Sequence, residues 1–412
     1  MERLIFHVDV NSAYLSWEAA RRVAEGGEDL RLIPAAIGGD PENRTGVILA
    51  KSIPAKKYNI RTGEPVALAL RKCPGLVLAR PDFRLYEKNS KAFMDICRRY
   101  APVVEKFSID ECFLDMTGTE KIYPQPLAVA HTIRQTIREE LGFTVNIGVS
   151  TNKLLAKMAS DFEKPDKVHT LFPEEIRLKL WPLPVGALFS VGRATAEKLQ
   201  RARICTVGDL AAAELSRLQA LVGRKLGGQL HAYANGQDNS PVSAEPEEAK
   251  GFSVSITLAE NVLDMETASK ILLELADSVT ARMRASHARA YCVSVSIRSS
   301  DFHNRSHQKK LEEPTDITKE VYEISKALLA DLWKSRTPLR LLGISLTQIV
   351  HEDAVQMSFF RDAQKEKARK LDRTLDAIRS RYGADTVKRG STCQTDLQVG
   401  RRYRAQMENK EE

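Results

Sequence analysis

The stretch FSIDECFLD, residues 107–115, places an adjacent acidic pair, Asp110 and Glu111, inside an apolar run. The flanking segments 103–108 and 111–116 are typical of two short strands that meet at this pair. Carboxylates among apolar strands are costly to bury unless an opposite charge offsets them. A divalent cation would provide that charge, and carboxylate oxygens are the ligands that Mg²⁺ prefers. The alternative is that the pair lies in a solvated hairpin turn.

A third carboxylate, Asp9, lies near the end of the first apolar strand, residues 4–10, and the helical segment 14–23 follows it. Carboxylates of this kind can hold two metal ions that clamp the attacking and leaving oxygens of phosphoryl transfer. Without a metal, Asp9 would only cap the end of its strand.

Strands and helices alternate through residues 1–165, and this order predicts a mixed sheet covered by helices. Short strands are expected within 31–80, and helices over 86–100 and 126–141. The strand 144–149 passes into a helix that Thr151 or Asn152 could cap.

Residues 168–235 are expected to be all helical. Within them, PVGALFSVGRATAEKLQRARICTVGDLAA (184–212) is similar to a helix-hairpin-helix. Gly192 and Arg193 open its second helix, where backbone N–H groups could face a DNA phosphate. The alternative is a tight turn between two packed helices.

A polar segment with glycine and proline, residues 236–250, indicates a linker. Residues 251–350 then show strand and helix periodicities in the order βαββαβ, which predicts a four-stranded sheet with both helices on one face. Its other face would present Ser253, Ser294, Ser296 and Arg298, which are ordinary phosphate contacts. The alternative is a solvated sheet face.

Length and composition limit the classes of protein to which the chain can belong. The chain has 412 residues, of which 43% are hydrophobic and 28% charged, and its 62 Lys and Arg against 54 Asp and Glu leave a net charge of +8. The length indicates several domains, and the positive charge makes a polyanionic partner plausible. No apolar run is long enough to span a membrane. Six scattered cysteines without a CxxC pair favour a reducing cytoplasm.

Three blocks together resemble the signatures of Y-family translesion DNA polymerases. They are HVDVNSAY at 7–14, SIDE at 108–111 and GVSTNK at 148–153, the last followed by Ala156-Lys157 and Lys164-Pro165. The resemblance covers about 1–360 and is nearest to the DNA polymerase IV (DinB) type. Each block alone is weak, but their order and spacing are specific.

The resemblance implies an α/β (α+β) multidomain fold shaped like a right hand. The palm, ferredoxin-like, would comprise residues 1–20 and 76–166, and the small fingers 21–75. A helix-hairpin-helix thumb would span 167–235, a linker 236–250 and a βαββαβ little finger 251–352. A clamp-binding peptide and a basic tail would occupy 353–412.

The resemblance also assigns chemistry. It implies a low-fidelity, template-directed DNA polymerase that adds dNTPs to a primer on primer-template DNA and takes part in translesion synthesis. Asp9, Asp110 and Glu111, with the carbonyl of Val10, would bind two Mg²⁺ ions.

Nucleotide contacts follow from the same resemblance. Tyr14 matches the steric gate, an aromatic ring placed where a ribose 2′-hydroxyl would project; its alternative is core packing of the first helix. Lys164 matches a lysine that meets the triphosphate. Four positions depart from the family pattern. Asn11 stands where many relatives have a second acidic residue. Ala13 replaces a common aromatic, Ile53 replaces a tyrosine, and Lys56 replaces an arginine, which removes the bidentate fork.

The segment Gln356-Met357-Ser358-Phe359-Phe360 resembles the bacterial sliding-clamp-binding pentapeptide. Such peptides dock an apolar pair in a pocket; the alternative is a short helix start packed on the core. We expect a monomer that binds DNA, dNTP and the clamp, with no membrane partner.

Two other functions stay open at this level. The first is a non-catalytic DNA- and clamp-binding factor that retains the polymerase fold, which the Ile53 and Lys56 departures favour and the three carboxylates oppose. The second is a palm-fold nucleotide cyclase, in which the thumb, the linker and the clamp peptide would have no role.

Overall fold

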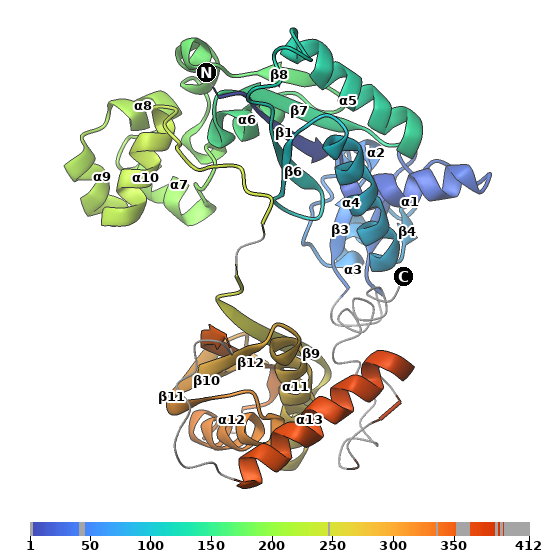
Figure 1. Ribbon diagram of the computed structural model, residues 1–412, viewed down its shortest axis with the longest axis vertical. Coiled ribbons are helices and arrows are strands. Elements are labelled where there is room, and N and C mark those ends of the chain that lie inside the picture. The colour runs from blue at the N-terminus through green and yellow to red at the C-terminus, as the bar shows by residue number, and fades with distance from the viewer. Residues whose placement is uncertain are drawn as a thin grey trace. The chain divides into compact units, whose positions relative to one another are not determined.

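The computed structural model describes residues 3–40, 46–245, 248–334, 337–351, 363–383, 386–387 and 390. The chain divides into two compact units (Figure 1). The first contains the described residues 3–40 and 47–245, and the second contains residue 46 and the described residues from 248 onward. Among the described helices, none is both long and apolar enough to cross a membrane.

The main sheet of the first unit has five strands in the order β5-β6-β1-β7-β8. Their bounds are β1 Ile5–Val10, β5 Val103–Lys106, β6 Glu111–Asp115, β7 Val145–Ser150 and β8 Val168–Thr170. β1 pairs antiparallel with β6 and β7, whereas β8 runs parallel to β7. The expected mixed sheet is therefore confirmed. The expectation that 168–235 is all helical is wrong at β8, because three residues there complete the sheet edge.

Alternation along β1 separates the two faces of this sheet. Phe6, Val8 and Val10 face the core that α4 (Phe83–Arg98) and α5 (Pro126–Leu141) cover (Figure 1). Ile5 packs on the other face with Ala156 of α6 (Lys153–Ser160). Because successive side chains of a strand point to opposite faces, Asp9 shares the α6 face.

Two smaller parts complete the first unit. A three-stranded sheet, ordered β3-β2-β4, has its own core with α2 and α3. The bounds are β2 Ala35–Gly38, β3 Ile48–Lys51, β4 Val77–Ala79, α2 Ile53–Lys56 and α3 Val66–Lys72; α1, Ala13–Ala24, precedes them. The helical part comprises short turns η1 Pro173–Glu175, η2 Ile176–Leu180 and η3 Val185–Ala187, then α7 Arg193–Arg201, α8 Val207–Ala212, α9 Leu215–Val222 and α10 Arg224–Ala234.

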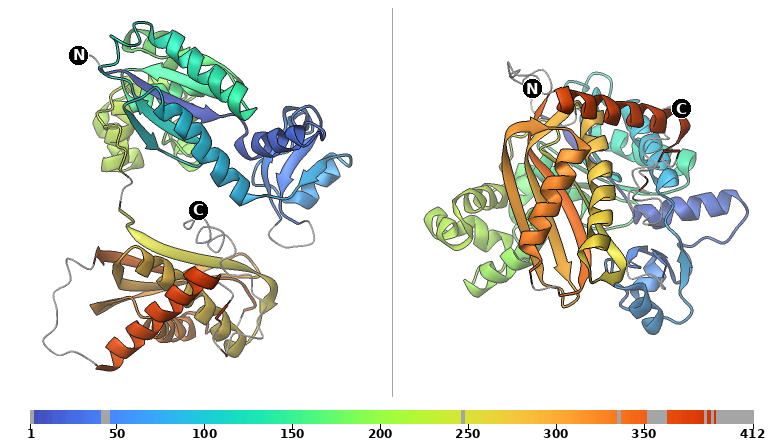
Figure 2. Two further views of the ribbon diagram at one scale, coloured as in Figure 1. Left: turned by 45° about the vertical axis from the view of Figure 1, so that its right-hand side comes forward. Right: turned by 90° about the horizontal axis from the view of Figure 1, so that it is seen from below.

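The second unit confirms the βαββαβ order. Its elements are β9 Gly251–Val262, α11 Met265–Ala285, β10 Ala288–Ser299, β11 Asn304–Thr315, α12 Thr318–Leu332 and β12 Leu339–His351. The antiparallel sheet is ordered β11-β10-β12-β9, and α11 and α12 lie side by side on one of its faces (Figure 2). A further helix, α13 (Ala363–Tyr382), packs against α11 and is longer than the expected 371–382.

Candidate active site

Asp9 and Glu111 are direct cross-strand partners on β1 and β6. On the other side of Asp9, the β7 residue opposite it is Asn146. The row Glu111–Asp9–Asn146 thus crosses three strands on the α6 face. Asp9 is only 7% exposed. Two carboxylates in one buried row require nearby positive charge.

Two lysines supply that charge. The Lys157 ammonium lies 2.6 Å from Glu111 Oε1 and 3.7 Å from Asp9 Oδ2. Lys164 Nζ lies 2.8 Å from Asp9 Oδ1 and 2.8 Å from Asp161 Oδ1. The carboxylates and ammonium groups therefore form one connected cluster at one end of the three central strands.

The close approach of α6 to the sheet places Lys157. Asn152 caps α6 by accepting a hydrogen bond from the Leu155 N–H, which resolves the choice between Thr151 and Asn152. A Cβ atom at Gly148 would lie 1.9 Å from the Ala156 carbonyl oxygen. Glycine is required at position 148, because any side chain would push α6 off the strand.

The electrostatics of the cluster are unusual for Glu111. Burial, and then the neighbouring Asp9, raise the pKa of Glu111 to about 7, while Lys157 opposes this shift. Burial lowers the pKa of Lys164, but Asp9 and Asp161 outweigh it, and the net shift is upward. Burial, and next Lys157, hold the pKa of His7 well below its ordinary value. His7 is therefore a neutral group behind Glu111, with Nε2 3.9 Å from Glu111 Oε2.

Asp110 lies at the same end of the strands as Glu111 and Asp9, but its contacts are with Val10 and Ser108. Its carbonyl oxygen accepts a hydrogen bond from the Val10 N–H at 3.0 Å, and its carboxylate accepts one from the Ser108 hydroxyl at 2.7 Å. Across the described residues, no three acidic, His or Cys side chains are grouped to hold one ion. The available donors are nonetheless hard carboxylate oxygens, which are the ligands that Mg²⁺ prefers. The donor set therefore fits a divalent ion.

Four of the five nucleotide residues expected from the sequence lie in two elements, and the fifth, Lys164, lies in the loop between α6 and β8. Ala13 and Tyr14 begin α1, directly after β1; Ala13 is buried, and Tyr14 is half-buried and stacks on Tyr86 with ring centroids 4.6 Å apart. Ile53 and Lys56 begin and end α2 in the three-stranded part, and Ile53 is 53% exposed. The contacts of Tyr14 with the rings around it agree with core packing and leave its gate role a prediction.

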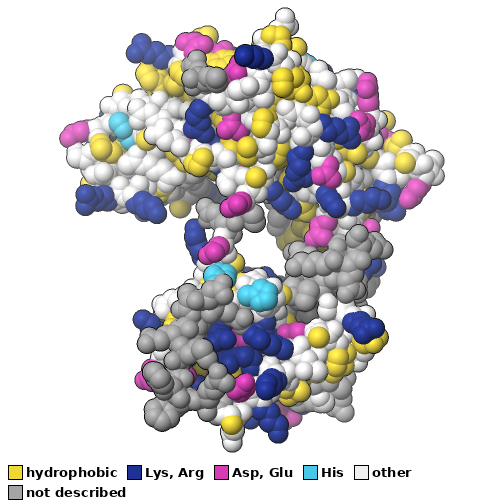
Figure 3. Space-filling model, viewed as in Figure 1, with side chains coloured by type: hydrophobic (Ala, Val, Ile, Leu, Met, Phe, Trp, Pro, Cys, Tyr) yellow, Lys and Arg dark blue, Asp and Glu magenta, His cyan; other side chains and the backbone are white. Residues whose placement is uncertain are grey.

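The open face of the second unit carries the expected hydroxyls. Ser253, Ser345 and Ser294 are aligned across β9, β12 and β10. In the next row Ser296 lies opposite Gly343, and Arg298 donates a hydrogen bond to Asn304 Oδ1 at 2.7 Å. Lys and Arg side chains lie among Asp and Glu on the visible faces of both units (Figure 3).

Gly192 is the N-cap of α7, and Arg193 is the first residue of that helix. The Arg193 side chain is 93% exposed and pairs with Glu197 at 3.0 Å. Both residues are accessible to a ligand, and contact with DNA stays a prediction. The clamp-peptide residues 356–360 lie outside the described residues.

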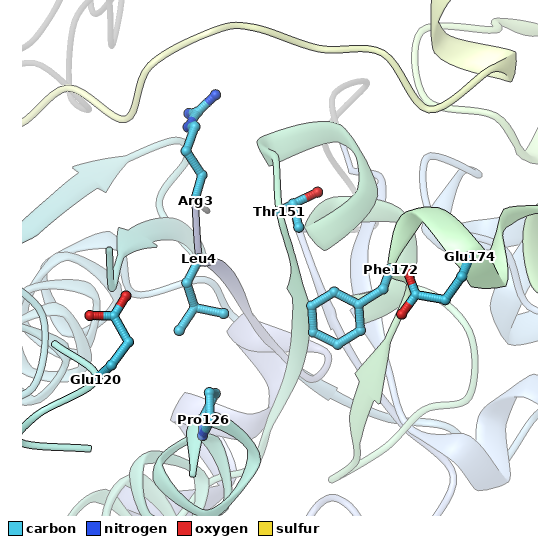
Figure 4. Close-up of a pocket in the computed structure, with 7 residues that line it drawn as sticks. All are labelled: Arg3, Leu4, Glu120, Pro126, Thr151, Phe172 and Glu174. Carbon is cyan, nitrogen blue, oxygen red and sulfur yellow. The ribbon is translucent and has the colours of Figure 1, made fainter. Parts of the chain in front are cut away.

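A separate pocket lies at the opposite end of β1. It is lined by Arg3, Leu4, Glu120, Pro126, Thr151, Phe172 and Glu174 (Figure 4). Leu4 and Asp9 are five residues apart along an extended segment, so about 17 Å separates this pocket from the carboxylate row. Its mixed charges do not complement a triphosphate, and it is not part of the candidate active site.

Sequence reasoning missed four residues of the cluster, namely Lys157, Asp161, His7 and Asn146. Lys157 carried a signal, because it lies in the third sequence block and follows the α6 cap by five residues. His7 also lies in a sequence block, the first one. Asn146 carried no signal, because only the strand register places it beside Asp9.

Comparison with known families agrees with this geometry. Residues 8–161 match the impB/mucB/samB family, residues 249–359 match its C-terminal domain, and residues 186–238 match the model described as DNA polymerase-iota, thumb domain. A solved chimeric Y-family DNA polymerase has the same fold, with a TM-score of 0.73 and 23% identity over 85% of this chain and 100% of that chain.

Curated relatives match over almost the full length. DNA polymerase IV of Clostridium acetobutylicum is 43% identical over 390 residues, which cover 94% of this chain and 98% of that protein. DNA polymerase IV of Clostridium kluyveri is 39% identical over 400 residues, covering 95% and 98%. DNA polymerase IV 2 of Bacillus subtilis is 36% identical over 400 residues, covering 95% of each. The chain therefore belongs to the Y family of DNA polymerases, in its DNA polymerase IV branch.

Proposed function

We propose that this chain is a template-directed DNA polymerase of low fidelity that extends a primer 3′ end and takes part in translesion synthesis. The observation that carries the proposal is the Asp9–Glu111 pair, flanked by Lys157 and Lys164 on the α6 face of the sheet. Family membership supports the reaction, and this cluster supports the place where it occurs.

Asp9, Asp110 and Glu111, with the Val10 carbonyl, would hold two Mg²⁺ ions. Ions bound there would offset the triphosphate charge and favour the ionised primer 3′-hydroxyl. Lys164 would meet the triphosphate as a point charge.

The remaining partners are assigned by surface chemistry. Gly192 and Arg193 on α7, together with Ser253, Ser294, Ser296 and Arg298 on the open sheet face, would contact the DNA backbone. Binding should therefore weaken steeply with salt. The segment 356–360 would dock on a sliding clamp, and the chain would act as a monomer.

Primer extension on an undamaged primer-template with Mg²⁺ and dNTPs tests this proposal. The Asp110→Ala/Glu111→Ala variant should lose on the order of 10³-fold in rate, because metal clamping contributes several kcal/mol to the transition state. Glu139→Gln, which alters an exposed carboxylate of α5, is the matched control and should extend the primer normally.

DNA binding by fluorescence anisotropy separates the alternatives. If the wild type binds primer-template but does not extend it, the proposed function becomes that of a non-catalytic DNA- and clamp-binding factor. Extension by the double variant at the wild-type rate would place the active site elsewhere.

A further inference from the structure

The loop that carries Lys164 connects α6 to β8 and is attached to the sheet by two buried side-chain amides. Asn146 on β7 is fully buried, and Asn11, just after β1, is 8% exposed. Together these amides form hydrogen bonds with backbone groups of four residues between 160 and 167. The loop is therefore held on both sides of position 164.

Asn146 uses all of its hydrogen-bonding groups. Its Nδ2 donates to the carbonyl oxygens of Ser160 at 3.1 Å and Glu163 at 2.7 Å. Its Oδ1 accepts from the Lys167 N–H at 3.2 Å and from Asn11 Nδ2 at 3.1 Å. Every partner of Nδ2 is a carbonyl and every partner of Oδ1 is a donor, so the amide orientation is determined.

Asn11 completes the connection. Its Oδ1 accepts from the Asp166 N–H at 2.9 Å and from the Thr144 hydroxyl at 3.0 Å, while its Nδ2 donates to Asn146. A carboxylate at position 11 could accept both of these bonds but could not donate to Asn146. The amide at position 11 therefore makes a bond that an acid could not make there.

The loop held in this way brings the Lys164 ammonium to 2.8 Å from Asp9. Asp9 lies directly opposite Asn146 in the strand register, so the anchor and the lysine both adjoin the same carboxylate. A flexible lysine on a loop loses conformational entropy when it contacts a ligand, and anchoring the backbone reduces that loss.

We propose that Asn11 and Asn146 are positioning residues that hold the Lys164 ammonium in place for the triphosphate of the incoming nucleotide. This inference rests on the proposed polymerase function and adds to it. Both amides would act through the backbone of the loop, to which they are hydrogen-bonded.

The test is the dNTP affinity of the full-length chain on a dideoxy-terminated primer-template, which reports binding without chemistry. Asn146→Ala removes four hydrogen bonds and should weaken dNTP binding at least about fivefold, with little change in DNA affinity. Asn11→Leu keeps a side chain of similar size without adding charge and loses the hydrogen bonds to Asn146, Asp166 and Thr144, so it should also weaken dNTP binding. Asn235→Ala, which removes an amide that donates to backbone carbonyls in the helical part, is the matched control.

A double-mutant comparison distinguishes positioning from general destabilisation. If Asn146 acts through Lys164, then Asn146→Ala/Lys164→Ala should bind dNTP as Lys164→Ala alone does. Multiplied losses in the double variant would overturn the inference, as would unchanged affinity in both Asn11→Leu and Asn146→Ala. Thermal melting shows whether Asn146→Ala has folded; if it has not, the dNTP affinity of Asn11→Leu provides the test instead. If the wild type does not extend a primer at all, the polymerase function itself is refuted.

Discussion

Helix α13 is held on the second unit by a buried guanidinium. Arg284 of α11 is 9% exposed, and its Nε and Nη2 donate to the Asp376 carboxylate at 2.6 and 3.1 Å. Its Nη1 donates to the Asp316 carbonyl oxygen at 2.7 Å and lies 3.6 Å from Asp372. Asp372 also accepts the Thr318 N–H at the start of α12. These contacts join three helices around one charge.

Replacing Arg284 with methionine would keep a long, apolar stem but leave Asp376 without its guanidinium. Removing one partner of a buried ion pair costs about 3–5 kcal/mol. The Asp376 side chain is 20% exposed, so water offsets part of the loss and we expect a value near 3 kcal/mol. For a unit of this size, that loss lowers the melting temperature by roughly 10 °C.

Scanning calorimetry of the full chain measures this effect as a shift of the second unit's transition. Hydrogen exchange of α13 amides shows whether the helix detaches. Lys270→Met is the control, because its pair with Glu266 is solvent-exposed and should have no measurable effect. Arg284→Met/Asp376→Leu should recover part of the stability, since apolar residues can replace a buried pair. A shift below about 2 °C for Arg284→Met would refute the reasoning.

Three further outcomes concern the active site. Burial, and next Asp9, raise the pKa of Glu111 to about 7, so the folded chain retains a proton that the unfolded chain loses near pH 4.5. The wild type should therefore lose stability as pH rises from 5 to about 8 in the presence of a chelator, whereas Glu111→Gln, which mimics the protonated form, should not. Melting temperatures that change equally with pH in the two proteins would contradict this. Lys157→Met should bind Mn²⁺ more tightly than the wild type, because the Lys157 ammonium no longer competes for the Glu111 oxygen. Titration calorimetry without nucleotide measures this affinity, and an unchanged value would count against the competition. Tyr14→Ala should incorporate ribonucleotides more readily relative to deoxynucleotides, and an unchanged ratio in primer extension would limit Tyr14 to core packing.

Strong periodicity made most elements predictable. Alternation of apolar and polar residues in 251–257 and 291–298 predicted strands that the second unit contains. The strand β8 escaped prediction, because three residues form no repeating pattern and are stabilised by pairing with β7. The start of α13 was also missed, because its inward face is formed largely by charged residues whose partners lie on other elements.

Residue type and order alone determined that Asp9, Asp110 and Glu111 are candidate ligands and that the chain resembles a polymerase. Carboxylates within apolar runs are informative without a structure, because their burial must be offset. Only the tertiary structure decided which groups offset it. Lys157 and Asn146 lie far from Asp9 in sequence, and strand register and helix packing bring them beside it. Such contacts depend on distances between elements, which local sequence patterns do not encode.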